Sequence, residues 1–196
     1  MMKKTFLKWP ALLGAFGGAL LLSACSSIPS QLDVPKQLEH NKQVYKLSSQ
    51  QDLGTVAHYL YTQPKENGKN WKSQIEVLFD RNEKNWSLQQ RADFRQKVFN
   101  GQGIKYFKFM PENDQLFAYV IYEPTAQNKD WQVNVSRGKQ LAHCGFMQYQ
   151  YSLKVPKSGK IKNLSAAKVA SYLAKFVVEK EMKNLREADW VLKCQK

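Results

Sequence analysis

The chain has 196 residues and a formal net charge of +14, with 30 basic and 16 acidic side chains. This length suits one domain with one hydrophobic core, to which ten Phe, nine Tyr and five Trp would contribute much of the buried area. After residue 25, no apolar run reaches the roughly 20 residues that a membrane-spanning helix needs. The composition indicates a single basic domain and excludes one that is embedded in a bilayer as a helix.

The first 24 residues have the pattern of a secretory signal. Lys3, Lys4 and Lys8 form a basic start, and an apolar run follows over residues 10–22. This run is too short to span a bilayer. It ends in the sequence LSAC, residues 22–25, which places Cys25 directly after a small residue. This motif, Leu22-Ser23-Ala24-Cys25, resembles the lipobox of bacterial lipoproteins.

The lipobox resemblance implies a lipid anchor. It implies that residues 1–24 are cleaved as a signal peptide, that the Cys25 sulfur receives a diacylglyceryl group, and that the new N-terminus is also acylated, as with palmitate. Two or three acyl chains anchor a protein stably in a membrane. Ser26 stands where inner-membrane lipoproteins of many Gram-negative bacteria have aspartate, so the resemblance implies the outer membrane, with the domain periplasmic or surface-exposed. The alternative is an ordinary cleaved signal in which Cys25 occurs by chance.

Residues 25–43 have the composition of a linker. They include Pro29 and Pro35, many polar side chains and little apolar periodicity. This pattern predicts a lipidated N-terminus with a flexible tether, whose root-mean-square span would be roughly 23 Å. The remaining residues, 44–196, are then expected to form a single α+β domain.

Alternating apolar and polar residues predict strands in two parts of the chain. In the first part, a strand is expected at residues 71–80, where Ile75, Val77 and Phe79 share one face. Residues 43–47 are a candidate for a first short strand. Residues 52–63 form either a strand around residues 56–61, which we favour, or a short helix. In the second part, four runs rich in β-branched and aromatic residues are separated by turn signals. They predict an antiparallel meander of strands at residues 104–110, 115–123, 130–138 and 144–155.

Two helices are predicted between and after these strands. Ser87 and Gln90 have the spacing of a capping box at the start of a helix that ends near Gly101. Ser165 is the expected N-cap of a long C-terminal helix with an apolar stripe. The predicted fold class is α+β, a mostly antiparallel sheet of five or six strands with one middle helix and one long C-terminal helix packed on it.

Cys144 and Cys194 are the two cysteines that remain beyond Cys25. A secreted protein reaches an oxidising compartment, where an even pair of cysteines is expected to form a disulfide. This bridge would attach the C-terminal residues to the domain. The alternative is a reactive thiol at Cys144 with His143 as its base, but neighbouring residues of a strand point to opposite faces, which disfavours such a dyad.

The sequence shows no pattern that points to an enzyme. It contains no nucleophile elbow, phosphate-binding loop or dinucleotide fingerprint. No cofactor is therefore expected. His40, His58 and His143 are far apart and lack metal-ligand spacing, so no metal site is expected. An envelope hydrolase with two carboxylates remains an alternative, with the candidate acids Glu76, Asp80 and Glu112.

The basic residues are concentrated near the C-terminus. Residues 154–196 contain 11 basic and four acidic side chains. Five of the lysines lie in a loop and at the start of the following helix, and they form a candidate polyanion-binding site: Lys154, Lys157, Lys160, Lys162 and Lys168. A field of one sign attracts polyanions. The alternative is a surface whose charge serves only solubility.

These observations predict a non-enzymatic outer-membrane lipoprotein. Its expected partners are the membrane, through the lipid anchor, and an envelope protein or anionic envelope polymer, in assembly or maintenance of the cell envelope. Nucleic acid is disfavoured, because aromatic residues in strands belong first to the core. A hydrolase and a surface-displayed protein that binds a ligand or a host remain the alternatives.

Overall fold

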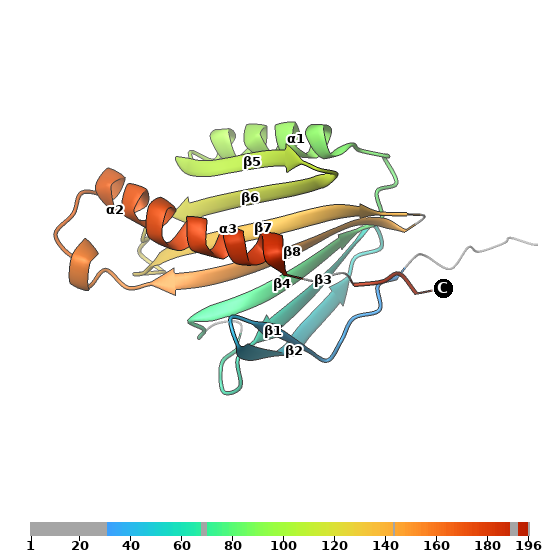
Figure 1. The fold of residues 1–196 in the computed structure, drawn as a ribbon, viewed down its shortest axis with the longest axis horizontal. Coiled ribbons are helices and arrows are strands. Elements are labelled where there is room, and N and C mark those ends of the chain that lie inside the picture. Colours follow the sequence, from blue (N-terminus) through green and yellow to red (C-terminus); the bar gives the residue numbers. More distant parts are fainter. Residues whose placement is uncertain (1–30, 68–69, 143, 189–191, 196) are drawn as a thin grey trace, which may run out of the picture.

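An eight-stranded antiparallel sheet forms the body of the molecule in the computed structural model, which describes residues 31–67, 70–142, 144–188 and 192–195 (Figure 1). The sheet is curved into a half-barrel. Its strands are β1 (Gln37–His40), β2 (Gln43–Asp52), β3 (Val56–Thr62), β4 (Ser73–Asp80), β5 (Tyr106–Glu112), β6 (Gln115–Tyr122), β7 (Trp131–Leu141) and β8 (Gly145–Val155).

The sheet consists of two meanders that meet in its middle. The strand order is β1-β2-β3-β4-β8-β7-β6-β5, and β4 pairs antiparallel with β8. At this seam Ile75 lies opposite Tyr151, and Val77 lies opposite Tyr149. Because β5 is at the far edge from β1, the helix α1 (Leu88–Gly101) carries the chain from the middle of the sheet to that edge.

The predicted fold class is wrong in its number of strands and in its helices. The sheet has eight strands, not five or six, partly because residues 37–40, which we expected in the tether, pair with β2. The expected capping box is present: the Gln90 backbone N–H donates to Ser87 Oγ, and the Ser87 N–H donates to Gln90 Oε1. The C-terminal helical run is not one regular helix. It comprises α2 (Ala166–Leu173), a π-helical turn (Ala174–Val178) and α3 (Glu179–Glu187).

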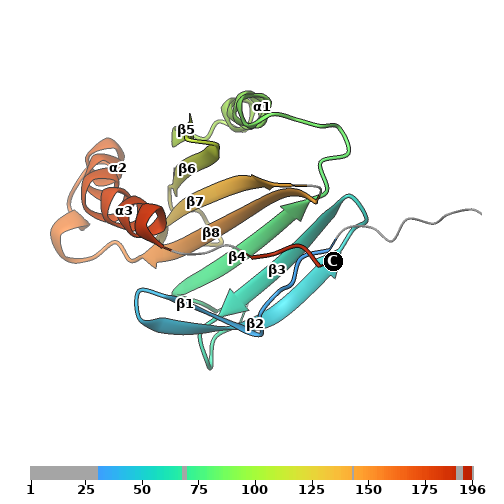
Figure 2. The ribbon, with the colours of Figure 1, turned by 45° about the vertical axis from the view of Figure 1, so that its right-hand side comes forward.

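The face of the sheet that α2 and α3 cover is called the inner face here (Figures 1 and 2). Leu173 and Leu185 of these helices are 0% and 1% exposed and belong to one large apolar cluster. Every other residue of the central strands contributes to this cluster, as the period of a strand requires. The sheet residues in it include Tyr45, Ala57, Tyr61, Ile75, Val77, Phe79, Phe117, Ile121, Val133, Val135, Met147, Tyr149 and Tyr151.

The opposite, outer face carries α1 over part of its width. A small apolar cluster joins Ala92 of α1 to Leu116 of β6 and Phe146 of β8. Beyond this cluster, β8 presents the polar residues Gln148 and Gln150 at the positions that alternate with the inner-face residues. The two helical units therefore lie on opposite faces, and the outer face is the more polar one.

The tether prediction does not hold for residues 31–43. Leu32 is 2% exposed and forms an isolated antiparallel bridge with Cys194, and His40 is 7% exposed. The Asp33 N–H donates to the Lys193 carbonyl oxygen at 2.8 Å. The two ends of the described chain thus lie side by side. In the described part of the chain, no helix has both the length and the apolar character to cross a membrane.

Candidate functional site

The predicted sites fall partly outside the described residues. The signal peptide, the lipobox and Cys25 lie there, as does His143, the expected base of the alternative thiol site. The predicted disulfide between Cys144 and Cys194 is confirmed, with Cα atoms 6.2 Å apart and a sequence separation of 50. Because Cys144 is bonded, it is not the reactive thiol of that alternative.

The five candidate lysines follow one another from the end of β8 into α2, and they are called the lysine segment below. Lys154 ends near Trp71, with its Nζ 4.4 Å from the ring centre. Lys157, Lys160 and Lys162 are exposed in and around a short 3-10 turn (Gly159–Ile161), which is fixed by the buried side chain of Ile161. Lys168 is exposed on α2.

The lysine segment contains no acid of its own. Residues 154–168 include the five lysines and no aspartate or glutamate, and the next acidic residue in the chain is Glu179. Among the ion pairs that the described residues form, none involves the five lysines of the segment. Unpaired like charges on one surface repel one another, and this repulsion is relieved when an anion binds. The polyanion site expected from the sequence stays a prediction, and the absence of these ion pairs is the observation on which it rests.

The segment lies at one end of the molecule. Both ribbon views place α2 and the loop before it at one end of the sheet and the C-terminal residues at the other (Figures 1 and 2). Since residues 31–33 pair with residues 193–195, the described N-terminal residues lie at the C-terminal end as well. The lysine segment and the point where the chain enters the fold are thus at opposite ends.

The three candidate carboxylates are each held by a basic side chain. Asp80 accepts from Arg91 Nη1 at 2.6 Å, and Glu112 accepts from Arg186 Nη1 at 2.8 Å. Glu76 lies 3.1 Å from Nε2 of His58. A pair of catalytic acids needs one carboxyl group free to donate a proton, so these three contacts do not favour the hydrolase.

No group of three or more potential metal ligands is present among the residues that the structure describes. His58 lies on β3 beside Glu76. His40 is not a tether residue, because it is buried on the inner face at the end of β1.

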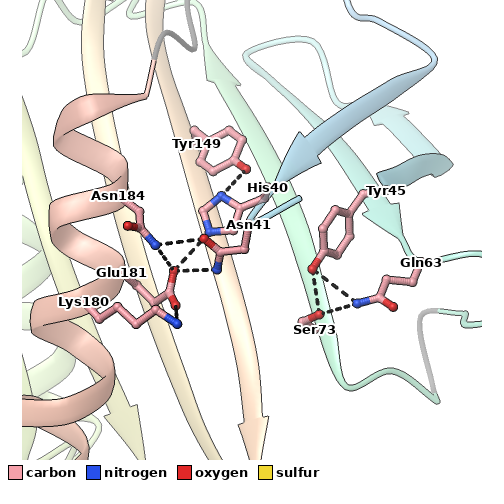
Figure 3. A network of polar contacts seen from close by, with 9 residues as sticks. All are labelled: His40, Asn41, Tyr45, Gln63, Ser73, Tyr149, Lys180, Glu181 and Asn184. Carbon is pink, nitrogen blue, oxygen red and sulfur yellow. Dashed lines mark hydrogen bonds and ion pairs between the residues drawn. The ribbon is translucent and has the colours of Figure 1, made fainter. Parts of the chain in front are cut away.

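His40 is the centre of a buried polar network that sequence analysis did not find (Figure 3). Its Nε2 lies 3.3 Å from Glu181 Oε2 and, because a carboxylate only accepts, donates to it. Its Nδ1 lies 3.0 Å from the hydroxyl of Tyr149. The imidazole also stacks on the Tyr151 ring, with ring centres 4.0 Å apart. The network thereby connects β1, β8 and α3.

Glu181 accepts three hydrogen bonds at one oxygen. Besides His40, the side-chain amides of Asn41 and Asn184 donate to Oε2 at 2.9 and 3.2 Å, and Asn184 also donates to Asn41. Burial alone would raise the pKa of Glu181, but the hydrogen bonds from His40 and the two amides outweigh it and leave this pKa below its ordinary value. Burial also raises the pKa of the Tyr149 hydroxyl.

A second, smaller set of polar contacts lies nearby on the inner face (Figure 3). The hydroxyls of Tyr45 and Ser73 are 2.8 Å apart, and Gln63 Nε2 donates to Ser73 Oγ at 2.9 Å. A mainly apolar cavity of about 280 Å³ lies beside His40 and Tyr149. His40 and Tyr149, which border this cavity, are hydrogen-bonded to each other, and His40 is also bonded to Glu181. We therefore interpret the network as a clamp between β1, β8 and α3.

Comparisons with known proteins place the chain in a family. A protein-family model matches residues 32–190, which is nearly all of the described fold. An uncharacterised protein of Haemophilus influenzae (strain ATCC 51907 / DSM 11121 / KW20 / Rd) is 44% identical over 184 residues, which cover 91% of this chain and 95% of that protein. No solved structure matches.

Proposed function

We propose a binding function for this chain, which belongs to the family that it shares with the Haemophilus influenzae protein. The chain would be a non-enzymatic lipoprotein of the bacterial outer membrane, anchored through Cys25, that binds an anionic partner in assembly or maintenance of the envelope. The observation that carries this proposal is the lysine segment, whose five lysines form no ion pair with the described residues of the chain.

The position of the lysine segment supports a partner other than the anchoring membrane. Five residues, 26–30, separate the lipidated cysteine of the proposal from the first described residue. Even fully extended, this connection would span only about 20 Å. The entry end of the fold would then stay near the bilayer, and the lysine segment, at the opposite end, would face away from it.

The chemistry of such a surface suits an acidic protein surface or an anionic polymer of the envelope. Ammonium groups on flexible stems attract anions without fixing one geometry, and their exposed ion pairs weaken as salt screens them. The proposal thus predicts binding that depends on net charge and falls with ionic strength.

The test is crosslinking in intact cells followed by purification of the lipidated protein. A triple variant, Lys157→Gln, Lys160→Gln and Lys162→Gln, removes three charges from the segment. A control variant, Lys36→Gln, Lys84→Gln and Lys97→Gln, removes the same charge from exposed lysines elsewhere. We expect the segment variant alone to lose the crosslinked partner.

Two outcomes would contradict the proposal, one for the lysine segment and one for the lipid anchor. Equal partner yields from the wild type and both variants would mean that the lysine segment serves only solubility. If Cys25→Ala leaves the protein in the membrane fraction with an unchanged mass, the lipid anchor is wrong. Protease treatment of intact cells distinguishes a periplasmic from a surface-exposed domain.

A further inference from the structure

Two arginines occupy the side of α1 that faces the sheet. A helix that packs on a sheet normally presents an apolar stripe at this spacing, and Leu88, Ala92 and Phe99 conform to it. Arg91 and Arg95, however, stand on the same side, above the ring of Phe146 at 4.3 and 6.0 Å. Arg91 is buried and Arg95 is half-buried. A cation that is withdrawn from water is costly unless it is paired, so each arginine requires a partner.

Arg91 has its partner within the fold. It is 5% exposed, and its Nη1 donates to Asp80 Oδ2 at 2.6 Å. This ion pair neutralises the first of the two charges.

Arg95, one turn later, has no carboxylate within ion-pair distance among the described residues, and its contact is the neutral oxygen of Gln148. Burial, with a smaller contribution from Arg91, lowers the pKa of Arg95 to about 10, although the negative charges of Asp80 and Glu76, beyond ion-pair distance, act to raise it. The guanidinium is therefore still charged at neutral pH.

Arg95 lines a cavity of about 210 Å³ between α1 and the outer face of the sheet. Its sheet side is unusually polar for a surface beneath a helix, because Asn134, Ser136 and Gln148 line it and are 8%, 5% and 7% exposed. Among the described residues, no hydrogen bond uses the Ser136 hydroxyl, the Asn134 amide nitrogen or the Gln148 amide nitrogen. The cavity thus combines one cation with neutral groups that can donate hydrogen bonds.

Part of the remaining wall is aromatic. Phe99 of α1 and Phe109 of β5 line the cavity with their ring centres 5.4 Å apart, and Tyr122 of β6 lines it as well. A small cavity with apolar walls and a few convergent polar groups is the usual form of a small-molecule site.

We propose that this cavity binds a small organic carboxylate, with its carboxyl group at Arg95 and Gln148 and its apolar part against Phe99 and Phe109. The planar guanidinium of arginine matches a carboxylate with two parallel hydrogen bonds. A single cation with no carboxylate at ion-pair distance suits a monoanion, whereas a phosphate group would bring up to two charges into a cavity that supplies one. The site uses none of the residues of the lysine segment and stands independently of the function proposed for it.

The experiment is isothermal titration calorimetry of the full chain in detergent, with phenylacetate as the probe and the neutral phenylacetamide as its matched control. We expect phenylacetate to bind at millimolar concentration or below, and at least about tenfold more tightly than phenylacetamide. The reason is that a hydrogen bond with a charged partner is stronger than one with a neutral partner. Hydrogen–deuterium exchange should slow in α1 when phenylacetate is present.

Three variants localise the binding. Arg95→Gln should remove the preference for the acid, and Gln148→Glu, which retains Arg95 but places a carboxylate beside it, should remove phenylacetate binding. Lys97→Gln, an equal charge change on the exposed side of the same helix, should bind as the wild type does. Circular dichroism verifies that each variant is folded.

The proposal is overturned by equal affinity for the two probes, or by no heat from either at millimolar concentration. It is also overturned if the protection from exchange appears in residues 154–168 instead of α1, since the acid would then bind the lysine segment. A loss of binding in Lys97→Gln that matches the loss in Arg95→Gln would likewise show that net charge, and not the cavity, attracts the probe.

Discussion

Glu181 is a buried carboxylate whose hydrogen-bond partners come from two separate parts of the chain. It is 5% exposed, and His40, Asn41 and Asn184 all donate to it. Lys180 Nζ lies 4.0 Å from its other oxygen. Removal of the Glu181 charge would leave the donors of three buried or part-buried hydrogen bonds without an acceptor of equal strength.

We predict that Glu181→Gln lowers the free energy of unfolding at neutral pH by about 1–3 kcal/mol. The folded-state pKa of Glu181 lies below its ordinary value of 4.5, so the ionised group contributes stability above that value and loses it as pH falls through the folded pKa. The difference between wild type and variant should therefore narrow in acid. Urea unfolding at neutral and acidic pH measures it, and a difference that stays constant with pH would contradict the role of the charge.

Some of the important residues could be predicted from the sequence, and others could not, for a physical reason. The pairing of Cys144 with Cys194 could be predicted because two cysteines that remain in an oxidising compartment are expected to form a disulfide with each other. The contact of His40 with Glu181 could not, because 141 residues separate them and neither belongs to a spacing motif. Arg95 fitted the helical repeat, but only the fold shows that it faces a polar cavity.

At the scale of elements, the turn between β7 and β8 depends on a glycine. Gly145 has a φ of +144°, and a Cβ atom there would lie 2.4 Å from the Asp80 carbonyl oxygen and 2.9 Å from the Arg81 Cα. Both neighbours are backbone atoms of the end of β4, which have little freedom to move. The close approach of the two meanders at this point therefore requires the absence of a side chain.

We predict that Gly145→Ala destabilises the protein by about 1–3 kcal/mol through backbone strain and steric overlap. Gly101→Ala is the matched control, because nothing lies within 4 Å of a Cβ there and the site is at the end of α1. It should raise stability by up to about 1 kcal/mol. Denaturation midpoints of the two variants test this, and equal changes would show that the contact at Gly145 is unimportant.

The elements themselves were largely predictable where periodicity extends over many residues. β3 to β8 and α1 correspond to the runs identified by alternation and capping. β1 was not predicted, because it has only four residues, QLEH, and follows two prolines. The turn after it, Asn41 and Lys42 with φ of 51° and 62°, has the positive values of a two-residue hairpin turn. Asn at this position was the signal available in the sequence.

At the scale of the whole molecule, the described N- and C-terminal segments close the fold together. The backbone of residues 31–33 pairs with that of residues 193–195, and the disulfide joins Cys194 to Cys144 at the turn between β7 and β8. Each of these segments is too short to be stable alone. The crosslink therefore supports the N-terminal residues indirectly, by keeping their pairing partner in place.

We predict that the double variant Cys144→Ser, Cys194→Ser loses up to roughly 4 kcal/mol of stability, as expected for a crosslink that closes a loop of this length. In hydrogen–deuterium exchange, residues 31–33 should lose protection together with residues 193–195, although their own sequence is unchanged. Reductant should lower the urea midpoint of the wild type to that of the variant and leave the variant unaffected. A wild-type midpoint that does not respond to reductant, with full reduction verified by mass, would show that the C-terminal segment is held by packing and backbone pairing instead of by the crosslink.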